Sequence, residues 1–322
     1  DVGETARLWR ILQQQFPNHP KLQKLTSRVR DVLHPLANVK EWETIDVKGR
    51  VWALAVSPSK KLLAVGTWAG EVYVLRWETG EVVFRRSLPR AVLAASFSPN
   101  GKYLAVGGCD CEVRLFEVKG GREIATAEVH CDRVCCLAFS PDSTLLVTAS
   151  DDNTCCVLRV PDLYLKFRFK EHKSPVRVVA FLLDDTILSA DTSGLALLWS
   201  LKRRASLISV KLPYPVGCIS VRSSRVLFGT SHALFALETG AFKTTKVAST
   251  GAVYAVFGYD DGTIIWRDST GLYFLTKSTK PRLITKTSSA GPLLVLKRNN
   301  QYFLFLGGRG KVVIGKAVPL LK

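Results

Sequence analysis

The sequence predicts an all-β fold in which seven similar four-stranded antiparallel sheets close into a ring, a seven-bladed β-propeller, after a short N-terminal helical extension. One pattern of short apolar strands and polar turns repeats through everything after about residue 43. The period of that pattern is near the roughly 40–45 residues of a four-stranded blade. Hydrophobic residues make up 47% of the 322-residue chain, which is ample for a packed core.

The first 40 residues follow a helical pattern. Trp9, Leu12 and Phe16 lie at helical spacing, and a second apolar stripe follows before Pro35. Two interpretations stay open. The helices pack on the propeller, or they form an arm that docks into a partner, with Trp9, Leu12 and Phe16 as contact residues. We therefore expect an extension at 1–40 and a propeller at 41–322.

The strand before the first unit and the end of the last unit predict how the ring closes. Glu41–Val47 reads as a strand, whereas the last unit runs out after Ile314. Pairing this N-terminal strand into the last blade would remove two exposed sheet edges. In the alternative, the segment AVPLL near the C-terminus forms the outer strand and the ring stays open.

Seven units can be aligned at the end of their first strand. The aligned residues are Val56, Phe97, Phe139, Phe181, Val221, Phe257 and Leu296. The intervals between them are 41, 42, 42, 40, 36 and 39 residues. A fourth strand follows in each unit, as in LYLKFRFK, where apolar and basic residues alternate with the period of a strand that has one wet face.

Short motifs recur at fixed places in these units. They are Ser57-Pro58, Ser98-Pro99 and Ser140-Pro141 in the first turn, His130 and His172 four residues before a Val, and Trp199 at the end of a third strand. In these features residues 43–322 resemble the WD-repeat family. The resemblance implies a propeller that acts as a non-enzymatic binding scaffold.

The resemblance also implies a structural hydrogen-bond set of His, Ser or Thr, Asp and Trp in each blade. His130, His172, Ser189 and Trp199 are the residues that match it. Unit four has Ser193 at the usual Asp position, so the set is expected to be incomplete there. No unit has the Trp-Asp dipeptide of the family.

No catalytic constellation is evident, so we expect no enzymatic activity, no cofactor and no small-molecule substrate. Cys109, Cys111, His130 and Cys131 lie in loops that share one face of such a propeller and could together offer four zinc ligands. The Cys-x-Cys spacing is not a typical zinc knuckle, and His130 has a structural role available. We interpret the cysteines as ordinary thiols and expect no metal.

Charge is uneven along the chain. The net charge is +18, and residues 161–322 carry 24 Lys and Arg against 9 Asp and Glu. The basic residues gather on predicted outer strands and their hairpins: Lys166, Arg168 and Lys170, then Lys202, Arg203 and Arg204, then Lys277, Lys280, Arg282 and Lys286. Each cluster alone is typical of a solvated rim. Three on one arc indicate contact with RNA phosphates or another polyanion.

Two functional hypotheses follow. In the first, the chain is a structural subunit of a large ribonucleoprotein or RNA-processing assembly, with RNA on the basic arc and neighbouring proteins on the faces and the arm. In the second, it is a peptide-binding adaptor of signalling, trafficking or ubiquitin-ligase complexes. Trp52, Trp68 and Trp266 would then converge around the central channel.

The expected compartment is intracellular, in the cytoplasm or the nucleus. Adjacent cysteines lie inside apolar runs, and the sequence has no Asn-x-Ser/Thr motif. No apolar run is long enough to cross a bilayer, so no membrane contact is expected.

Overall fold

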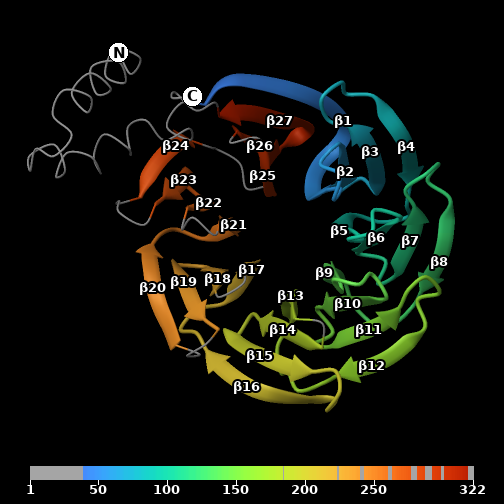
Figure 1. Ribbon diagram of the computed structural model, residues 1–322, viewed down its shortest axis with the longest axis vertical. Helices are drawn as coiled ribbons and strands as arrows, with labels where there is room; N and C mark the ends of the chain where they lie inside the picture. The colour runs from blue at the N-terminus through green and yellow to red at the C-terminus, as the bar shows by residue number, and fades with distance from the viewer. Residues whose placement is uncertain are drawn as a thin grey trace, which may run out of the picture.

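The structure, a computed structural model, describes residues 39–183, 185–222, 225–239, 243–259, 263–276, 281–286, 292–298 and 301–317. In this part of the chain all regular structure is β, in 27 strands arranged around a central opening (Figure 1). The expected helices of the extension, with Trp9, Leu12 and Phe16, lie outside the described residues.

Five sheets have four antiparallel strands in chain order. The first is β5 (Val92–Phe97), β6 (Tyr103–Gly108), β7 (Val113–Glu117) and β8 (Glu123–Ala127). The second is β9 (Val134–Phe139), β10 (Leu145–Ser150), β11 (Cys155–Arg159) and β12 (Leu165–Phe169). The third is β13 (Val176–Leu183), β14 (Thr186–Asp191), β15 (Leu195–Ser200) and β16 (Ala205–Lys211).

The other two continue the series. They are β17 (Val216–Arg222), β18 (Arg225–Thr230), β19 (Ala233–Glu238) and β20 (Lys243–Ser249), then β21 (Val253–Gly258), β22 (Ile264–Asp268), β23 (Gly271–Leu275) and β24 (Arg282–Lys286). Within each sheet the first strand lies next to the opening and the fourth lies at the perimeter (Figure 1). Such repeated four-stranded antiparallel sheets are the architecture of a β-propeller.

The sixth sheet joins the two ends of the described chain. Its order is β25-β26-β27-β1-β2-β3-β4. The strands are β25 (Leu293–Arg298), β26 (Gln301–Gly307), β27 (Arg309–Ala317), β1 (Val39–Val56), β2 (Leu62–Thr67), β3 (Glu71–Arg76) and β4 (Val82–Ser87). The N-terminal part of β1 pairs with β27, with Thr44 opposite Val313, and its C-terminal part pairs with β2, with Leu54 opposite Val65.

This pairing confirms the predicted closure. The N-terminal strand runs along the outside of β27 and then turns to the inside of β2 (Figure 1). The expected strand at Glu41–Val47 is the first part of this longer strand, which begins at Val39. The alternative of an open ring is therefore wrong.

Burial follows the position of a strand in its sheet. Second strands such as β10 and β14 are buried at every residue but the first, whereas the outer strand β16 alternates exposed and half-buried residues along its whole length. The two faces of each sheet meet the faces of its neighbours. One apolar cluster, for example, joins Val147 and Val157 to Ile187 and Trp199 of the next sheet.

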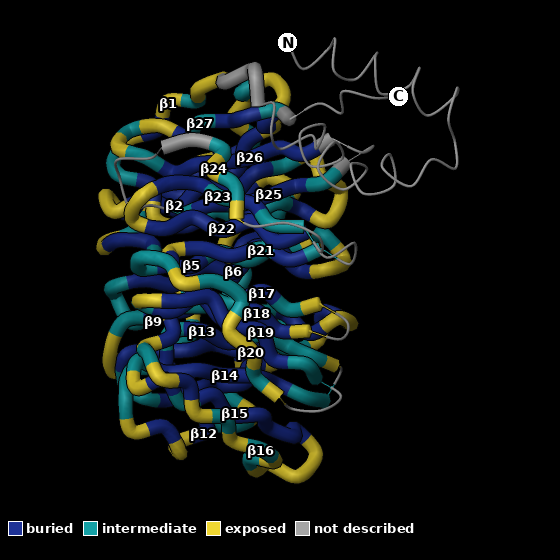
Figure 2. Tube along the Cα trace, turned by 90° about the vertical axis from the view of Figure 1, so that its left-hand side faces the viewer, coloured by how far each residue is buried: buried dark blue, intermediate teal, exposed yellow. Residues whose placement is uncertain are grey.

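The core is thus a series of apolar layers between sheets rather than one centre. Viewed from the side, buried segments form the stacked sheets, and exposed segments lie at the two ends and at the perimeter (Figure 2). A single sheet cannot bury both of its faces, so each depends on two neighbours for its stability. The turns left at the two ends are therefore the parts available for binding.

Candidate binding site at the mouth of the central channel

A buried hydrogen-bond chain links the segment before the first strand of the β13–β16 sheet to the second and third strands of that sheet. The indole Nε1 of Trp199 donates to Ser189 Oγ at 2.7 Å, and Ser189 Oγ lies 2.7 Å from His172 Nε2. His172 Nδ1 lies 2.7 Å from Asp191 Oδ2. The expectation of an incomplete set with Ser193 at the Asp position is therefore wrong.

Asp191 takes that place because it ends β14 and also closes the tight turn that follows. Its Oδ1 accepts hydrogen bonds from the Ser193 hydroxyl at 2.6 Å and from the Leu195 backbone N–H at 3.1 Å. Because one carboxylate binds both the turn and the imidazole, Asp191 fills this role from a position two residues earlier in the sequence than position 193, where the resemblance places the Asp. Ser193 is bound to Asp191 instead of replacing it.

The donor order in this chain determines the protonation of His172. The Asp191 carboxylate can only accept, so His172 Nδ1 carries a proton, and in a neutral ring Nε2 then accepts from the Ser189 hydroxyl. Burial lowers the pKa of His172, although the hydrogen bond to Asp191 opposes this. The imidazole is therefore neutral and structural.

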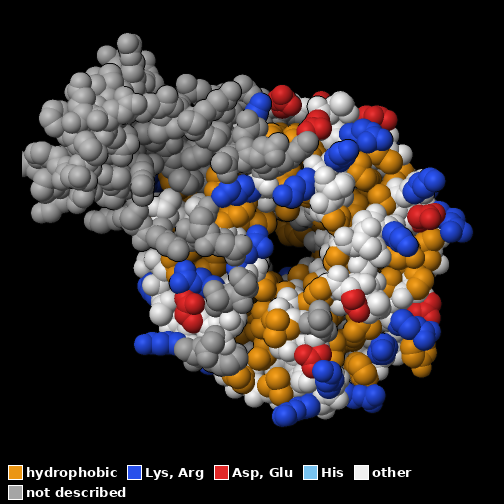
Figure 3. Space-filling model, in the orientation of Figure 1, with side chains coloured by type: hydrophobic (Ala, Val, Ile, Leu, Met, Phe, Trp, Pro, Cys, Tyr) orange, Lys and Arg blue, Asp and Glu red, His pale blue; other side chains and the backbone are white. Residues whose placement is uncertain are grey.

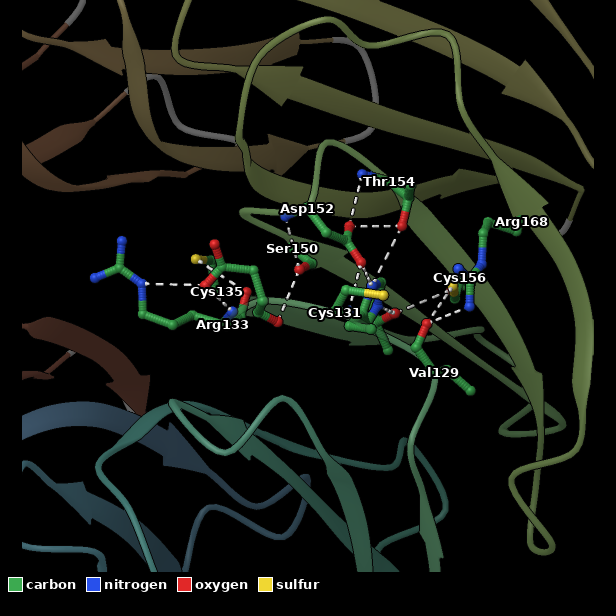
Figure 4. A network of polar contacts seen from close by, with 12 residues as sticks. Val129, Cys131, Arg133, Cys135, Ser150, Asp152, Thr154, Cys156 and Arg168 are labelled. Atoms are coloured by element: carbon green, nitrogen blue, oxygen red, sulfur yellow. Dashed lines mark hydrogen bonds and ion pairs between the residues drawn. The ribbon is translucent and has the colours of Figure 1, made fainter.

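The preceding sheet contains a related but extended network (Figure 4). His130 Nε2 lies 2.6 Å from Thr148 Oγ1, and His130 Nδ1 lies 2.9 Å from Asp152 Oδ2. Asp152 also accepts from the Cys131 backbone N–H at 3.1 Å and from the Thr154 hydroxyl at 2.7 Å. Both ring nitrogens of His130 are thus occupied by protein groups.

These contacts matter for the four residues that the sequence offered as possible zinc ligands, which are Cys109, Cys111, His130 and Cys131. His130 is turned into the protein, whereas Cys131 is exposed. Burial raises the pKa of both Cys109 and Cys111, so neither thiol is primed to ionise. Among the described residues no group of three or more His, Cys, Asp and Glu is arranged to hold a metal ion.

Most of the innermost strands share an irregularity where their pairing with the second strand begins. In six of them the pairing with the second strand skips one residue, as between Val176 and Val178. The skipped residues are Trp52, Leu93, Cys135, Arg177, Gly217 and Tyr254. A bulge of this kind leaves one residue out of the ladder and redirects its side chain.

These six residues, which we call the channel mouth, line one cavity. The cavity has a volume of about 510 Å³. Its remaining walls come from residues just before the inner strands, such as Pro215 and Pro292, and from turns between second and third strands, such as Thr192 and Ser231. The bulges therefore direct side chains from equivalent positions of successive sheets into one cavity, and these side chains differ in their chemistry.

Arg177 is the one charged residue among the described residues that line this cavity. Its Nε lies 3.1 Å from Oδ1 of Asp151, a buried carboxylate that also pairs with Arg133 Nη2 at 2.5 Å. Cys135 Sγ donates to the same Oδ1 at 3.3 Å, and burial raises the pKa of this thiol to about 12. Cys135 is therefore a protonated donor in this cluster.

Aromatic rings form the opposite part of the rim. Trp52 and Trp68 are 39% and 52% exposed, and their ring centroids lie 5.2 Å apart. The Arg50 guanidinium lies 5.2 Å from the Trp52 ring centroid, close enough for a cation–π contact. Tyr254 is also exposed, at 40%. Exposed aromatic side chains of this kind are typical anchors at protein interfaces.

Trp266 does not belong to this group, and its expected role as a contact residue is wrong. The residue is 1% exposed and packs in an apolar cluster with Leu227 and Leu234 of the preceding sheet. Its ring stacks on Tyr273 with centroids 5.4 Å apart. It lies in the second strand of its sheet, where both faces are covered, so its side chain fills a layer between sheets.

The predicted polyanion residues differ in their surroundings. Lys166, Lys170, Lys202, Arg203 and Arg204 are exposed. Arg168 is half-buried and donates to the Val129 carbonyl, so it ties β12 to the segment that connects β8 to β9 (Figure 4).

The Arg204 guanidinium lies 4.3 Å from the Phe167 ring centroid, and Lys202 is 3.6 Å from Asp185. Lys277 and Lys280 lie outside the described residues. Arg282 is half-buried in β24, which ends at Lys286. On the part of the face that Figure 3 shows uncovered, Lys and Arg side chains lie at several places along the perimeter and also near the central opening, so they are not confined to one arc.

Five channel-mouth residues had no signal of function in the sequence: Leu93, Cys135, Arg177, Gly217 and Tyr254. The clue that could have found them is positional. Each follows a buried Val that begins an inner strand, and this Val recurs in every strand that carries a bulge whereas the residue after it varies. Among described residues no helix has the length and apolar character needed to span a membrane.

Comparison with known proteins gives a family match and several relatives. A family model described as the WD40 domain of anaphase-promoting complex subunit 4 matches residues 54–142. An uncharacterized WD repeat-containing protein of Schizosaccharomyces pombe is 32% identical over 32% of this chain and 26% of its own length. Autophagy-related protein 18 of the same yeast is 32% identical over 42% of this chain and 38% of its own length.

A p21-activated protein kinase-interacting protein 1-like protein of Danio rerio is 29% identical over 60% of this chain and 52% of its own length. The matches thus span about half or less of these relatives. The matched segments, the repeated four-stranded sheets and the His–Ser–Asp–Trp set agree on one assignment. Together they support the assignment of this chain to the WD-repeat family.

Proposed function

We propose that this protein is a non-enzymatic, intracellular interaction scaffold that binds short segments of partner proteins at the channel mouth. The observation that carries the proposal is the cavity of about 510 Å³, with exposed Trp52 and Tyr254 on one side and Arg177 on the other. Concave sites that combine aromatic rings with a few polar groups are the usual form of specific binding sites.

The proposed ring has seven blades. β1 contributes one segment to the blade of β25–β27 and another to the blade of β2–β4. Counted in this way, every sheet has four strands, which supports the count. Seven inner strands would then surround the channel. Six of them carry a bulge, and the seventh, β25, has Leu294 at the equivalent position without a bulge.

Two further observations support the scaffold role and its compartment. The names of the kinase-interacting and autophagy-related relatives associate those proteins with larger cellular processes, which fits a binding subunit. All eight cysteines are free thiols. Several of them are buried in cores or in the Asp151 cluster, as in proteins of a reducing compartment.

The proposal is tested by affinity purification from a cell extract with the intact chain and two variants. Trp52→Ala combined with Trp68→Ala removes the exposed aromatic pair, and we expect it to lose the partners that wild type retains. The matched control, Arg203→Ala with Arg204→Ala, removes exposed side chains at the perimeter. Loss of partners from the control but not from the aromatic variant would refute the channel-mouth assignment.

A second candidate function is contact with RNA in a ribonucleoprotein. The observation that favours it is the run of exposed cations on adjoining perimeter strands: Lys166, Lys170, Lys202, Arg203 and Arg204. Phosphate contacts would make binding to structured RNA fall steeply as salt rises. Filter binding over a salt series tests this, and an affinity that is negligible at low salt or unchanged by salt would refute it.

A further inference from the structure

We infer that the channel mouth recognises a partner segment carrying an Asp or Glu next to a bulky apolar residue, with Arg177 binding the carboxylate and the hollow over Gly217 accepting the apolar side chain. This inference rests on the proposed function and names the chemistry of its partner. Arg177 and Gly217 occupy the same bulge position in consecutive sheets, so their subsites are neighbours.

Arg177 is held ready for an anion. Asp151 fixes its Nε at 3.1 Å, and Nη1 lies 3.8 Å from Cys135 Sγ, a weak acceptor. Among the described residues Nη2 has no hydrogen-bond acceptor. The side chain is 37% exposed, so this edge of the guanidinium can reach a ligand in the cavity. A guanidinium whose orientation is already fixed loses less side-chain entropy on binding.

The surroundings favour a carboxylate over a phosphate. Asp151 already shares its charge between Arg133 and Arg177, and Arg133 also lies 3.9 Å from the exposed Asp132. A dianionic phosphate on Arg177 would meet repulsion from Asp151, and the described residues that line the cavity include no second cation to offset it. A singly charged carboxylate matches one partly compensated guanidinium.

The apolar subsite arises because Gly217 leaves empty the space that larger side chains fill at equivalent positions. A Cβ at Gly217 would come no nearer than 3.6 Å to any neighbouring atom, an ordinary contact. Trp52, Leu93 and Tyr254 show that this position accepts large side chains in other sheets. Pro215 and Val253 give the hollow apolar walls.

The test is selection from a phage-displayed library of random dodecapeptides on the intact chain. Wild type is compared with Arg177→Gln, with Gly217→Tyr, and with Arg203→Gln as a charge-matched control outside the cavity. In Arg177→Gln, Asp151 keeps Arg133 as its partner, so the fold should be retained. Thermal unfolding of each variant confirms this before selection.

We expect wild type to enrich peptides with Asp or Glu beside an aromatic or large aliphatic residue. A synthetic enriched peptide should lose affinity about tenfold on Arg177→Gln and on replacing its acid by the amide, and remain unchanged on Arg203→Gln. Gly217→Tyr should select against the bulky residue while the acid preference persists.

Three outcomes would overturn the inference, and they separate it from the proposed function. Peptides that bind the channel mouth without an acid, and equally well to Arg177→Gln, would leave a binding site but refute the carboxylate subsite. A phosphoserine in place of the acid that raises affinity more than tenfold would replace carboxylate by phosphate. No enriched peptide, or peptides insensitive to every cavity variant, would refute the proposed function itself.

Discussion

At the scale of single residues, the buried hydrogen-bond chain of the β13–β16 sheet shows how a polar set can replace part of an apolar core. Ser189 Oγ bonds both to Trp199 Nε1 and to His172 Nε2. Without it, each of these two nitrogens would be a buried polar atom without this partner. Such a network specifies one arrangement because any other leaves donors unsatisfied.

Ser189→Ala should therefore be costly for so small a change. Two buried donors or acceptors, the Trp199 indole N–H and His172 Nε2, lose their partner, and each unsatisfied group costs about 1–3 kcal/mol. We expect the free energy of unfolding in urea to fall by about 2–4 kcal/mol. Ser209→Ala, on the exposed face of β16, is the matched control and should change it by less than about 0.5 kcal/mol.

Acid should destabilise the fold through the same residues. Burial lowers the pKa of His172 and of His130 below the value of about 6.5 that each has in the unfolded chain. The unfolded state then binds more protons, so stability is complete above pH 6.5 and falls as the pH drops below it. Each histidine contributes at most about 1.4 kcal/mol per pH unit.

Urea unfolding between pH 7.5 and 5.5 measures this slope. His172→Gln should make it shallower, whereas the same change at the exposed His232 should leave it as in wild type. A slope that is flat in wild type, or that His172→Gln does not alter, would contradict the neutral assignment of His172.

At the scale of elements, the turns between first and second strands illustrate how repeats conserve a backbone while changing the residue. Lys60, Gly101 and Ser143 occupy the same place in three successive turns, and all have positive φ: 58°, 73° and 64°. In each, the backbone N–H of this residue donates to the carbonyl of the Ser three residues earlier. Only glycine adopts this conformation without strain.

Exchanging residues at this position should therefore have opposite effects in two turns. Lys60→Gly is expected to raise the free energy of unfolding by up to about 1 kcal/mol, and Gly101→Ala to lower it by about 1 kcal/mol. Gly101 has open space around a Cβ, so any loss there reports backbone strain alone. Thermal unfolding of both variants measures this, and a shift in the same direction for both would argue against strain.

The repeat allowed the strands and the ring to be predicted, because alternation and period depend on local sequence. The bulges could not be predicted, since the residue that leaves a ladder depends on how two strands align in space. Trp266 was misplaced for a similar reason: nothing in its local sequence distinguishes a second strand, covered on both faces, from an exposed turn. Asp191 was missed because fixed family spacing does not allow for a shorter turn.

At the scale of the whole molecule, one strand unites the two ends of the ring. Ile45 and Val47 of β1 pack in the same apolar cluster as Phe305 of β26, Ile314 of β27 and Leu75 of β3. The ring is thus closed both by the hydrogen bonds between β1 and β27 and by an apolar layer. Loss of either should destabilise β25–β27 and β1–β4 together.

Ile45→Asp tests this coupling. A carboxylate in that apolar cluster should lower the free energy of unfolding by about 2–4 kcal/mol and should increase amide exchange in β25–β27 as well as in β1. Glu43→Gln, an exposed change in the same segment, is the control. Exchange that rises in β1 alone would show that the last sheet is stable without closure.

The shared strand also has a consequence for biosynthesis. A ribosome makes the N-terminal half of β1 long before its partner β27, so until then a strand edge of the nascent chain has no neighbour to cover it. Such an edge is open to pairing with other chains, which makes this interval the one at which aggregation or chaperone capture competes with folding. The ring is sealed last, at the point where its beginning and its end first coexist.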